Sequence, residues 1–367
     1  MTDRIMIMAD DLTGALDSAV AFADGTRRVI VARSPETVSH ALRLQPDVLA
    51  INTASREGAP ARAREQVSTA LAALSPDRFS IIFKKIDSRL KGHIATETAM
   101  LATWAARRRL LVCPAIPDMG RHVAQGALCG AGVKTPISVT ERLGEPEGMT
   151  LDIPDVSSIT DLDRIVENTH PGTLWVGARG LAFALARSIG CGRPILPPLA
   201  HPLLIANGSR DPVTQVQIAA LPPDFLIIEA ENGALPSLFA IAPETSMALS
   251  ITDGRQGLSG TQAAREFALS TADLAQTCTP RSLVICGGET AQAILDRMGV
   301  EHLYVIGELR PGLPLCRIET PWGPMCVVTK SGGFGAQGLL ASLVAGHEDD
   351  MDSCGPPTGS AQKAPQT

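Results

Sequence analysis

The segment Met325-Cys326-Val327-Val328-Thr329-Lys330-Ser331-Gly332-Gly333-Phe334-Gly335 organises the fold that we expect for this chain. Its apolar, β-branched first half is typical of a buried strand, and a lysine, a serine and three glycines follow at once. Glycine-rich turns let backbone N–H groups approach an anion, and residues 336–345 can supply a helix whose N-terminus adds positive partial charge. The segment is therefore either a phosphate-binding turn or a tight turn between a strand and a helix.

Three glycines of this region, Gly333, Gly335 and Gly338, also match the G-x-G-x-x-G pattern of dinucleotide-binding turns. Such a site needs a second strand and an acidic residue about 20 positions later. The chain instead continues into Gly346-His347-Glu348-Asp349-Asp350 and a polar stretch, where we expect disorder. We therefore reject a dinucleotide site at this position.

Composition narrows the class of protein. The chain has 367 residues, of which 45% are hydrophobic and only 3% aromatic, so its cores are built from small aliphatic side chains, as in parallel α/β proteins. A net charge of -6 argues against a broad nucleic-acid-binding surface, and no apolar run approaches the length of a membrane span. The N-terminus lacks a signal-peptide pattern. The eight cysteines contain no C-x-x-C pair and the histidines no H-E-x-x-H motif. We therefore expect reduced core cysteines in a cytoplasmic protein, with no disulfides, no zinc ligands and no metal held by the protein alone.

In the first half of the chain, short apolar runs alternate with helical stretches, which predicts βαβ units with right-handed crossovers. The strands are expected at 4–9, 28–32, 48–51, 79–83 and 109–113, and the helices at 15–23, 61–74 and 95–107. Charged residues follow these strands, namely Asp10, Asp11, Arg56, Lys85, Asp87 and Arg121. If the strand ends converge, cations can hold the carboxylate of a small sugar acid and carboxylates can hold its hydroxyl groups. The alternatives are a helix cap at Asp11 and surface ion pairs.

The middle of the chain is rich in Gly, Pro and Thr between residues 126 and 155, where we expect an excursion with a short hairpin at 137–142. In the second half, glycines gather at the ends of predicted strands. They occur in Asn207-Gly208-Ser209, in Gly287-Gly288-Glu289-Thr290, in the segment ending at Gly312 and in the loop after Lys330. This concentration favours a nucleotide-binding site.

Six motifs, taken in order, resemble the four-carbon acid sugar kinase family from Ile5 to about Ala345. They are Ala9-Asp10-Asp11-Leu12-Thr13-Gly14-Ala15, Lys85-Ile86-Asp87-Ser88, Pro114-Ala115 with Gly120-Arg121, Asn207-Gly208-Ser209, Gly287-Gly288-Glu289-Thr290 and Lys330-Ser331-Gly332-Gly333-Phe334-Gly335. The resemblance implies an α/β fold of two domains, each with a mostly parallel sheet flanked by helices. Residues 1–190 would bind a sugar acid, 191–202 would be a linker, 203–345 would bind a nucleotide and 346–367 would form a disordered tail.

The resemblance also implies an ATP-dependent kinase that uses Mg²⁺ and phosphorylates a hydroxyl, expected to be the terminal one, of a tetronate, 3-oxo-tetronate or related acid. Catalysis is assigned to Asp10, Asp11 and Asp87. With neighbouring strand-end residues included, the predicted substrate ligands are Arg56, Lys85, Asp87, Ser88, Arg89, Lys91 and Arg121. The predicted ATP ligands are Ser209, Gly287, Gly288, Glu289, Thr290, Gly312, Lys330, Ser331, Gly332 and Gly333.

Two departures from the family bear on specificity. Arg89, Lys91 and His93 stand where we expect threonine, arginine and asparagine, which suggests a preferred acid other than the common tetronates. The second domain is shorter than usual between Asp224 and Gly260, near the part of the site where we expect the adenine of ATP.

The alternative functions are a nicotinamide-dependent oxidoreductase and a sugar-acid-binding protein without enzymatic activity. We expect small-molecule partners, no nucleic acid or membrane, and allow for a homodimer.

Overall fold

The computed structural model describes residues 3–144, 146–236, 244–254 and 258–346. The helices are α1 (Leu12–Ala19), α2 (Val38–Arg43), α3 (Pro60–Ala72), α4 (Ile94–Trp104), α5 (Val139–Leu143), α6 (Ile159–Glu167), α7 (Arg179–Ser188), α8 (Pro212–Ala219), α9 (Gly260–Cys278), α10 (Gly288–Arg297) and α11 (Leu339–Ala345). The strands are β1 (Ile5–Ala9), β2 (Val29–Ala32), β3 (Val48–Asn52), β4 (Ile81–Lys85), β5 (Arg109–Cys113), β6 (Arg121–Ala124), β7 (Ala127–Gly130), β8 (Ile137–Ser138), β9 (Thr150–Asp152), β10 (Leu174–Gly177), β11 (Leu203–Asn207), β12 (Leu226–Glu231), β13 (Met247–Thr252), β14 (Ser282–Cys286), β15 (His302–Arg310), β16 (Leu313–Thr320) and β17 (Gly323–Lys330).

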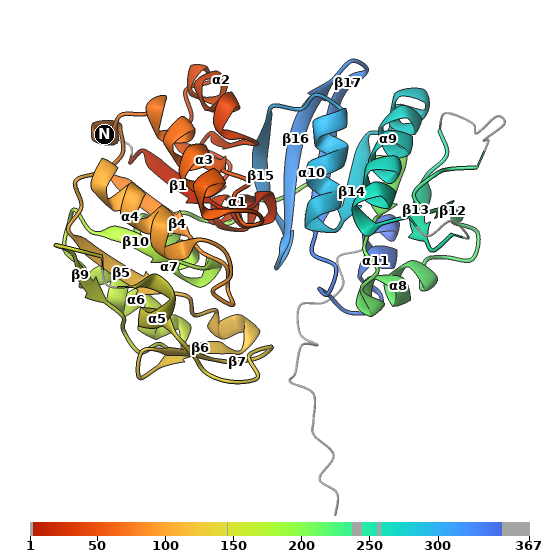
Figure 1. The fold of residues 1–367 in the computed structure, drawn as a ribbon. Coiled ribbons are helices and arrows are strands. Elements are labelled where there is room, and N and C mark those ends of the chain that lie inside the picture. The colour runs from red at the N-terminus through yellow and green to blue at the C-terminus, as the bar shows by residue number, and fades with distance from the viewer. Residues whose placement is uncertain (1–2, 145, 237–243, 255–257, 347–367) are drawn as a thin grey trace, which may run out of the picture.

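Fourteen of these strands form one sheet in the order β12-β13-β11-β14-β17-β16-β15-β2-β3-β1-β4-β10-β5-β9 (Figure 1). The sheet is mostly parallel, and its antiparallel pairs are β15 with β16, β16 with β17, and β15 with β2. The predicted fold class, a mostly parallel α/β fold flanked by helices, is therefore confirmed. The two expected sheets, however, are joined into one, because residues 302–305 of β15 pair with residues 29–32 of β2.

We call residues 3–190 the N-half and residues 203–345 the C-half. Both halves repeat one local arrangement of strands. The order β2-β3-β1-β4 in the N-half matches β12-β13-β11-β14 in the C-half, with the first strand of each unit in an inner position. The domain boundaries themselves stay a prediction. Residues 191–200, in the expected linker, contain no helix or strand.

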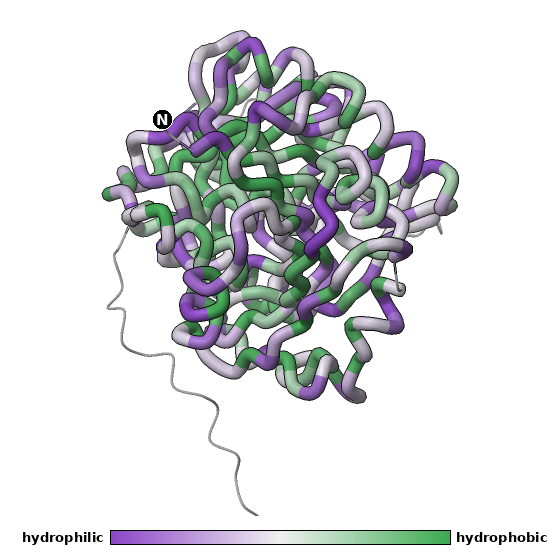
Figure 2. Tube along the Cα trace, turned by 90° about the vertical axis from the view of Figure 1, so that its left-hand side faces the viewer, coloured by the Kyte–Doolittle hydropathy of each residue, from purple (hydrophilic) through white to green (hydrophobic). Residues whose placement is uncertain are grey.

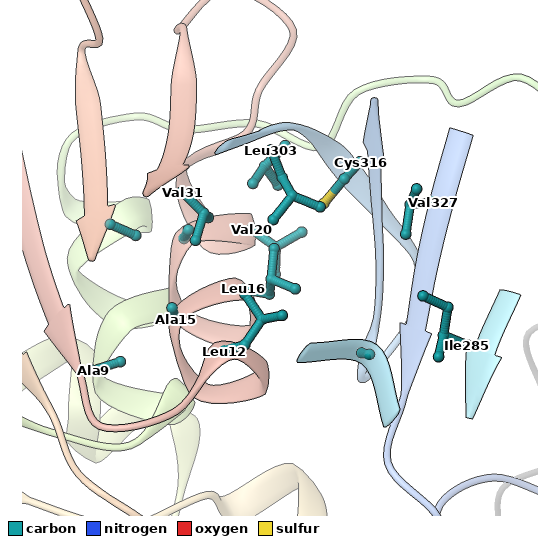
Figure 3. Packing of buried hydrophobic residues seen from close by; sticks show 14 of the residues in the cluster. Ala9, Leu12, Ala15, Leu16, Val20, Val31, Ile285, Leu303, Cys316 and Val327 are labelled. Carbon is teal, nitrogen blue, oxygen red and sulfur yellow. The ribbon is translucent and has the colours of Figure 1, made fainter. Parts of the chain in front are cut away.

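The twist of the sheet brings the two sets of strand ends together. Six strand-to-strand steps separate β14 from β1. Neighbouring strands of a sheet are rotated by about 20–25° relative to each other, so six steps accumulate a rotation on the order of 120–150°. This rotation offsets most of the reversal in strand direction that the antiparallel pairing of β2 with β15 introduces. In Figure 3 the strands that carry Ala9, Ile285 and Val327 accordingly point the same way.

Hydrophobic residues fill both faces of the sheet, and hydrophobic stretches run through the middle of the molecule (Figure 2). One face carries α1, α6, α7, α9 and α10 over a single core cluster that spans both halves. The other face carries α2 to α5 over the N-half and α8 with α11 over the C-half. Figure 3 shows Leu16 and Val20 of α1 directed toward Leu303 and Cys316 of the C-half. The two halves therefore share the core cluster on this face of the sheet, whereas the other face has a separate cluster over each half.

Two local predictions are wrong. Residues 137–142 do not form a hairpin, because Ser138 caps α5 by accepting the backbone N–H of Glu141, and β8 pairs with β7 in a separate sheet of order β6-β7-β8. The last helix begins at Leu339 and not at residue 336, because the side chain of Gln217 donates to the carbonyl oxygens of Phe334 and Ala336 and holds them in the loop. The predicted disordered tail, apart from Gly346, lies outside the described residues.

Among the helices in the described parts of the chain, none combines the length and the hydropathy that a membrane crossing requires.

Candidate active site

An open cavity of about 570 Å³ lies between the two halves. The N-half contributes residues that follow β1, β3, β4, β5 and β10, and the C-half contributes α10 and the loop after β17. Among the predicted site residues, those in the wall are Asp10, Asp11, Arg56, Lys85, Asp87, Ser88, Gly288, Glu289, Ser331 and Gly332. Residues predicted separately for the sugar acid and for ATP thus face one space.

Arg56 holds the two aspartates that follow β1. Its Nε and Nη2 donate to the carboxylate of Asp10 at 2.9 and 2.8 Å, and its Nη1 and Nη2 donate to that of Asp11 at 2.9 and 2.8 Å. The backbone N–H of Arg56 also donates to the carbonyl oxygen of Asp10. Because its guanidinium is occupied by these carboxylates, Arg56 orients the aspartates, and the predicted direct contact with a substrate carboxylate would require it to exchange partners.

The two aspartates differ in their pKa values. Burial opposes ionisation of Asp10, but the hydrogen bond from Arg56 and the charge of Lys84 outweigh it, so the pKa of Asp10 lies below its ordinary value of 3.8. Burial raises the pKa of Asp11 above 3.8, the charge of Asp10 adds to the rise, and Arg56 offsets only part of it. The side chain of Asp11 keeps 28% of its surface exposed, which tempers the effect of burial. Asp10 is thus the better fixed anion and Asp11 the better proton acceptor.

Asp11 is also the N-cap of α1, where it accepts the N–H of Gly14 at 2.9 Å. The predicted cap and the predicted site residue are therefore the same side chain. Gly14 allows a close approach, since a Cβ at this position would lie 2.4 Å from Asp11 Oδ1 and 3.2 Å from Lys85 Nζ. A larger residue at 14 would push both functional groups out of place.

Lys85, at the end of β4, carries a positive charge into the cavity wall. Only 4% of the residue is exposed, and its ammonium group has no hydrogen bond or ion pair to any residue in the described part of the chain. Its charge is opposed by the nearby carboxylates of Asp10 and Asp11, but its hydrogen-bond donors remain available to a ligand in the cavity. Lys85 is therefore well suited to bind an anionic group in the cavity.

The loop after β4 separates into an inner and an outer part. Asp87 lies 3.6 Å from Arg56 and accepts the N–H of Arg89 at 2.8 Å, and the hydroxyl of Ser88 accepts Nη1 of Arg121 at 2.8 Å. The side chains of Arg89 and Lys91 are exposed and lie outside the cavity wall. Direct substrate contacts by these two residues thus lack support in this structure, because their side chains are in solvent.

In the C-half, three loops follow the neighbouring strands β11, β14 and β17. The N-terminus of α10 has Gly287 as its N-cap and no side-chain cap, so its backbone N–H groups are available to an anion. Gly288 touches the N-half here, because a Cβ would lie 2.8 Å from the hydroxyl oxygen of Thr13. Gly288, Glu289, Ser331 and Gly332 thus form the wall opposite the aspartates.

A second layer supports this wall without lining it. It comprises the predicted ATP ligands Ser209, Gly287, Thr290, Lys330 and Gly333. Lys330 is 1% exposed and donates to Thr214 Oγ1 at 2.9 Å and to the carbonyl oxygens of Ser331 and Gly332 at 3.0 and 3.1 Å. Burial lowers the pKa of Lys330, and Cys286 and Asp211 offset part of the shift. The ammonium of Lys330 therefore holds the backbone of the glycine loop. The sequence, in contrast, predicts that this ammonium faces a bound anion.

Gly312 is also placed differently from the prediction. It lies in the two-residue turn between the antiparallel strands β15 and β16, with φ of 77°, and is not in the cavity wall. The turn requires a positive φ, which glycine adopts without strain. Its contact is with Phe334, whose ring carbons would lie 3.0 Å from a Cβ on Gly312.

Two family models match the chain, one in each half. A family model described as a sugar-binding N-terminal domain matches residues 5–150, and one described as a nucleotide-binding C-terminal domain matches residues 204–340. The chain belongs to the four-carbon acid sugar kinase family. The resemblance seen in the six motifs is thereby confirmed.

Curated relatives of the family cover almost the whole chain. A D-threonate kinase of Cupriavidus necator is 29% identical, over 91% of this chain and 96% of its own length. A 3-oxo-tetronate kinase of Pseudomonas savastanoi pv. phaseolicola is 24% identical, over 92% of this chain and 95% of its own length. A solved structure from Salmonella typhimurium LT2 has a TM-score of 0.72 at 19% identity and covers 91% of this chain and 97% of that one, which shows the shared fold.

This member of the family has site residues that the sequence interpretation missed. Asn52, at the end of β3, donates to Gln292 Oε1 of α10 at 3.0 Å, and both line the cavity together with Thr13 and Asp17. Asp17, on α1, accepts Nη1 of Arg179 at 2.8 Å. Asn52 follows a predicted strand and was within reach of sequence reasoning, whereas Gln292 has no such marker.

A buried ion pair beneath the site was also missed. Lys84 Nζ lies 2.7 Å from Glu97 Oε2, both residues are 1% exposed, and Glu97 also accepts the hydroxyl of Ser55. Ser55 precedes Arg56, so this pair holds the loop that presents Arg56 to the aspartates. The adjacent pair Lys84-Lys85 in β4 is the only sequence signal for this ion pair. Adjacent strand residues point to opposite faces of the sheet, so only one of the two lysines can face the cavity.

Proposed function

We propose that this protein transfers a phosphoryl group from ATP to a hydroxyl group of a small, four-carbon sugar acid. The observation that carries the proposal is the single cavity with two unlike walls. One wall has the carboxylates of Asp10 and Asp11 beside the ammonium of Lys85, and the other has the backbone of Gly288 and Gly332. A volume of about 570 Å³ suits a small acid together with the terminal phosphates of a nucleotide.

On the acceptor wall, Asp11 is the proposed general base. Its raised pKa makes it a better proton acceptor than Asp10, and general bases contribute about a hundredfold to ten-thousandfold to a rate. Asp10 and Asp87 orient the hydroxyl groups, and Arg56 holds the carboxylates. Lys85 is the proposed partner of the acid's carboxylate, because its ammonium lines the cavity and makes no hydrogen bond within the described part of the chain.

On the nucleotide wall, the free N–H groups at the start of α10 and the glycine loop at 331–332 are proposed to bind phosphate oxygens. ATP is the proposed donor, which follows from the kinase names of the relatives. Ser209, Gly287, Thr290, Lys330 and Gly333 would act indirectly, by fixing the loops.

Magnesium fits this wall as a phosphate-bound ion. In the described parts of the chain no group of three potential ligands is clustered for a metal, but Mg²⁺ is usually held by one or two carboxylates and the substrate phosphates. Glu289 lines the cavity at the start of α10 and its carboxylate has no described ion pair, so it is the proposed protein ligand. The ion would neutralise phosphate charge.

The names of the relatives favour threonate or a 3-oxo-tetronate as the acid, and the terminal hydroxyl is the least hindered acceptor. The seven described cysteines are all free, which is consistent with the cytoplasm, where ATP is available. A homodimer stays a prediction.

The test is a coupled assay of ADP release with ATP, Mg²⁺ and a panel of threonate, erythronate, 3-oxo-tetronates and other small sugar acids. Acid-dependent ADP release, with a phosphate ester seen by phosphorus NMR, supports the proposal. NAD-dependent oxidation of the same acids, or binding without turnover, would replace it with one of the two alternatives.

A pair of lysine variants tests the site within the same assay. Lys85→Met should raise the Michaelis constant for the acid by about ten- to a hundredfold, because it removes a buried charge partner. Lys134→Met, an exposed lysine before β8, should leave it unchanged. Equal behaviour of both variants would remove Lys85 from the proposed site.

A further inference from the structure

A chain of direct contacts connects the acceptor wall to the nucleotide wall by a route outside the cavity. It begins at Asp17 of α1, which lines the cavity, and passes to Arg179, the first residue of α7. Arg179 is 4% exposed, and its Nη1 lies 2.8 Å from Asp17 Oδ1. The guanidinium carbon of Arg179 lies 4.5 Å from the centroid of the Phe183 ring, and this contact fixes the plane of the guanidinium group.

The contact chain crosses from the N-half to the C-half at Glu308 of β15. Nη1 of Arg179 donates to Glu308 Oε1 at 2.9 Å, and Nη2 donates to Oε2 at 3.3 Å. Both carboxylates favour the charged guanidinium, so the pKa of Arg179 is raised although burial acts in the opposite direction. This ion pair is therefore a buried connection between the two halves, separate from the shared strand pairing.

Glu308 also binds the turn between β15 and β16. Its Oε1 accepts the backbone N–H of Gly312 at 2.6 Å, so one oxygen serves both the guanidinium and the turn. The ring of Phe334 rests directly on Gly312. Phe334 belongs to the glycine loop, and that loop contributes Ser331 and Gly332 to the cavity wall.

We infer that Glu308 is a positioning residue, which sets the glycine loop at 331–335 against the acceptor wall through Gly312 and Phe334. The inference rests on the proposed function for the identity of the ligand, but not for the contacts. The substitution Glu308→Gln tests this role, because one glutamine side chain cannot keep both contacts of the glutamate. If its oxygen takes the place of Oε1, its amide group meets Nη2 of Arg179, and if the side chain flips, the acceptor for Gly312 is lost.

The experiment measures the glycine loop directly. In hydrogen–deuterium exchange without ligands, Glu308→Gln should speed exchange of peptides that cover residues 331–338. The dissociation constant for ATP, measured by calorimetry, should rise about five- to tenfold, while that for the sugar acid stays within twofold. Asp163→Asn is the matched control, because it breaks an exposed ion pair of the same helix α7, to Arg187, within the N-half.

A second variant covers the case in which Glu308→Gln does not fold. Phe334→Leu removes the ring that rests on Gly312 and leaves the ion pair intact, and it should reproduce the faster exchange and the weaker ATP binding. Combined in one protein, the two substitutions should weaken ATP binding by less than the product of their separate effects.

Unchanged exchange and ATP affinity in both single variants would overturn the inference, as would an equal loss of affinity for both ligands with the same loss in Asp163→Asn. If wild-type protein releases no ADP with any acid, the proposed function fails, but the exchange experiment still decides the role of Glu308.

Discussion

The two halves of the molecule share a strand order and differ in the chemistry that follows their strands. At the ends of β1, β3 and β4 the chain places Asp10, Asp11, Arg56 and Lys85, whereas glycines gather in the loops after β11, β14 and β17. Charged side chains recognise a ligand by reaching toward it, and glycines let a ligand approach the backbone. Under the proposed function, one topology serves two kinds of recognition, and the loops at the strand ends distinguish the two halves.

The largest expected effect tests the charged half. Asp11→Asn should lower the turnover number about a thousandfold, because the proposed base is lost. The melting temperature should change little, since asparagine can still cap α1 and, because burial raises the pKa of Asp11, its ionisation is not expected to stabilise the fold. In wild-type protein, turnover should decline as the pH falls toward the raised pKa of Asp11. Near-normal turnover in the variant would reduce Asp11 to a helix cap.

The next effect tests the glycine half. In Gly332→Ala, the new methyl group would lie 2.2 Å from Ser209 Oγ, so the loop has to move, and ATP affinity should fall about tenfold or more. Gly338→Ala is the control in the same loop, because nothing lies within 4 Å of that position. Calorimetry with ATP and with the acid separates the halves. A loss of acid binding as large as the loss of ATP binding would contradict the division of labour.

A smaller effect distinguishes the two aspartates by stability. Because the pKa of Asp10 is lowered, its ionised form stabilises the fold fully above pH 3.8, and this contribution is lost as the pH falls through the folded value. Asp10→Asn should therefore lower the melting temperature at pH 7 by roughly 2–5 °C. The difference from wild type should shrink in acid. A similar loss for Asp11→Asn would erase the contrast between the two carboxylates.

The smallest effect concerns the outer part of the substrate loop. Arg89→Thr restores the residue expected in the family, but the arginine side chain is exposed and outside the cavity wall. Exposed charges are screened by salt, so kcat/KM for each acid should change by less than about threefold. A switch in the preferred acid would show that Arg89 reaches the ligand and would revive the specificity expected from the sequence.

Local patterns were sufficient to predict most strands and the residues that follow them. The strand at 282–286 and the pairing of Asp11 with the start of α1 both follow from short stretches of sequence. The direction of a side chain does not. Lys330 turns into its own loop because Thr214, 116 positions away, supplies a hydroxyl acceptor. The pairing of β15 with β2 and the ion pair of Glu308 with Arg179 likewise depend on partners more than 100 positions away, which no motif marks.

The pairing of β2 with β15 has a consequence for how the protein is made. Residues 302–305 leave the ribosome some 270 positions after residues 29–32, so at about 5–20 residues per second the edge of β2 waits roughly 15–55 s for its partner. An uncovered edge of Val29, Ile30 and Val31 is a template for pairing between nascent chains. Although the two halves carry separate family descriptions, they are not interchangeable modules. A chimaera that joins this N-half to the C-half of a relative has to preserve the pairing of β2 with β15 before its active site can form.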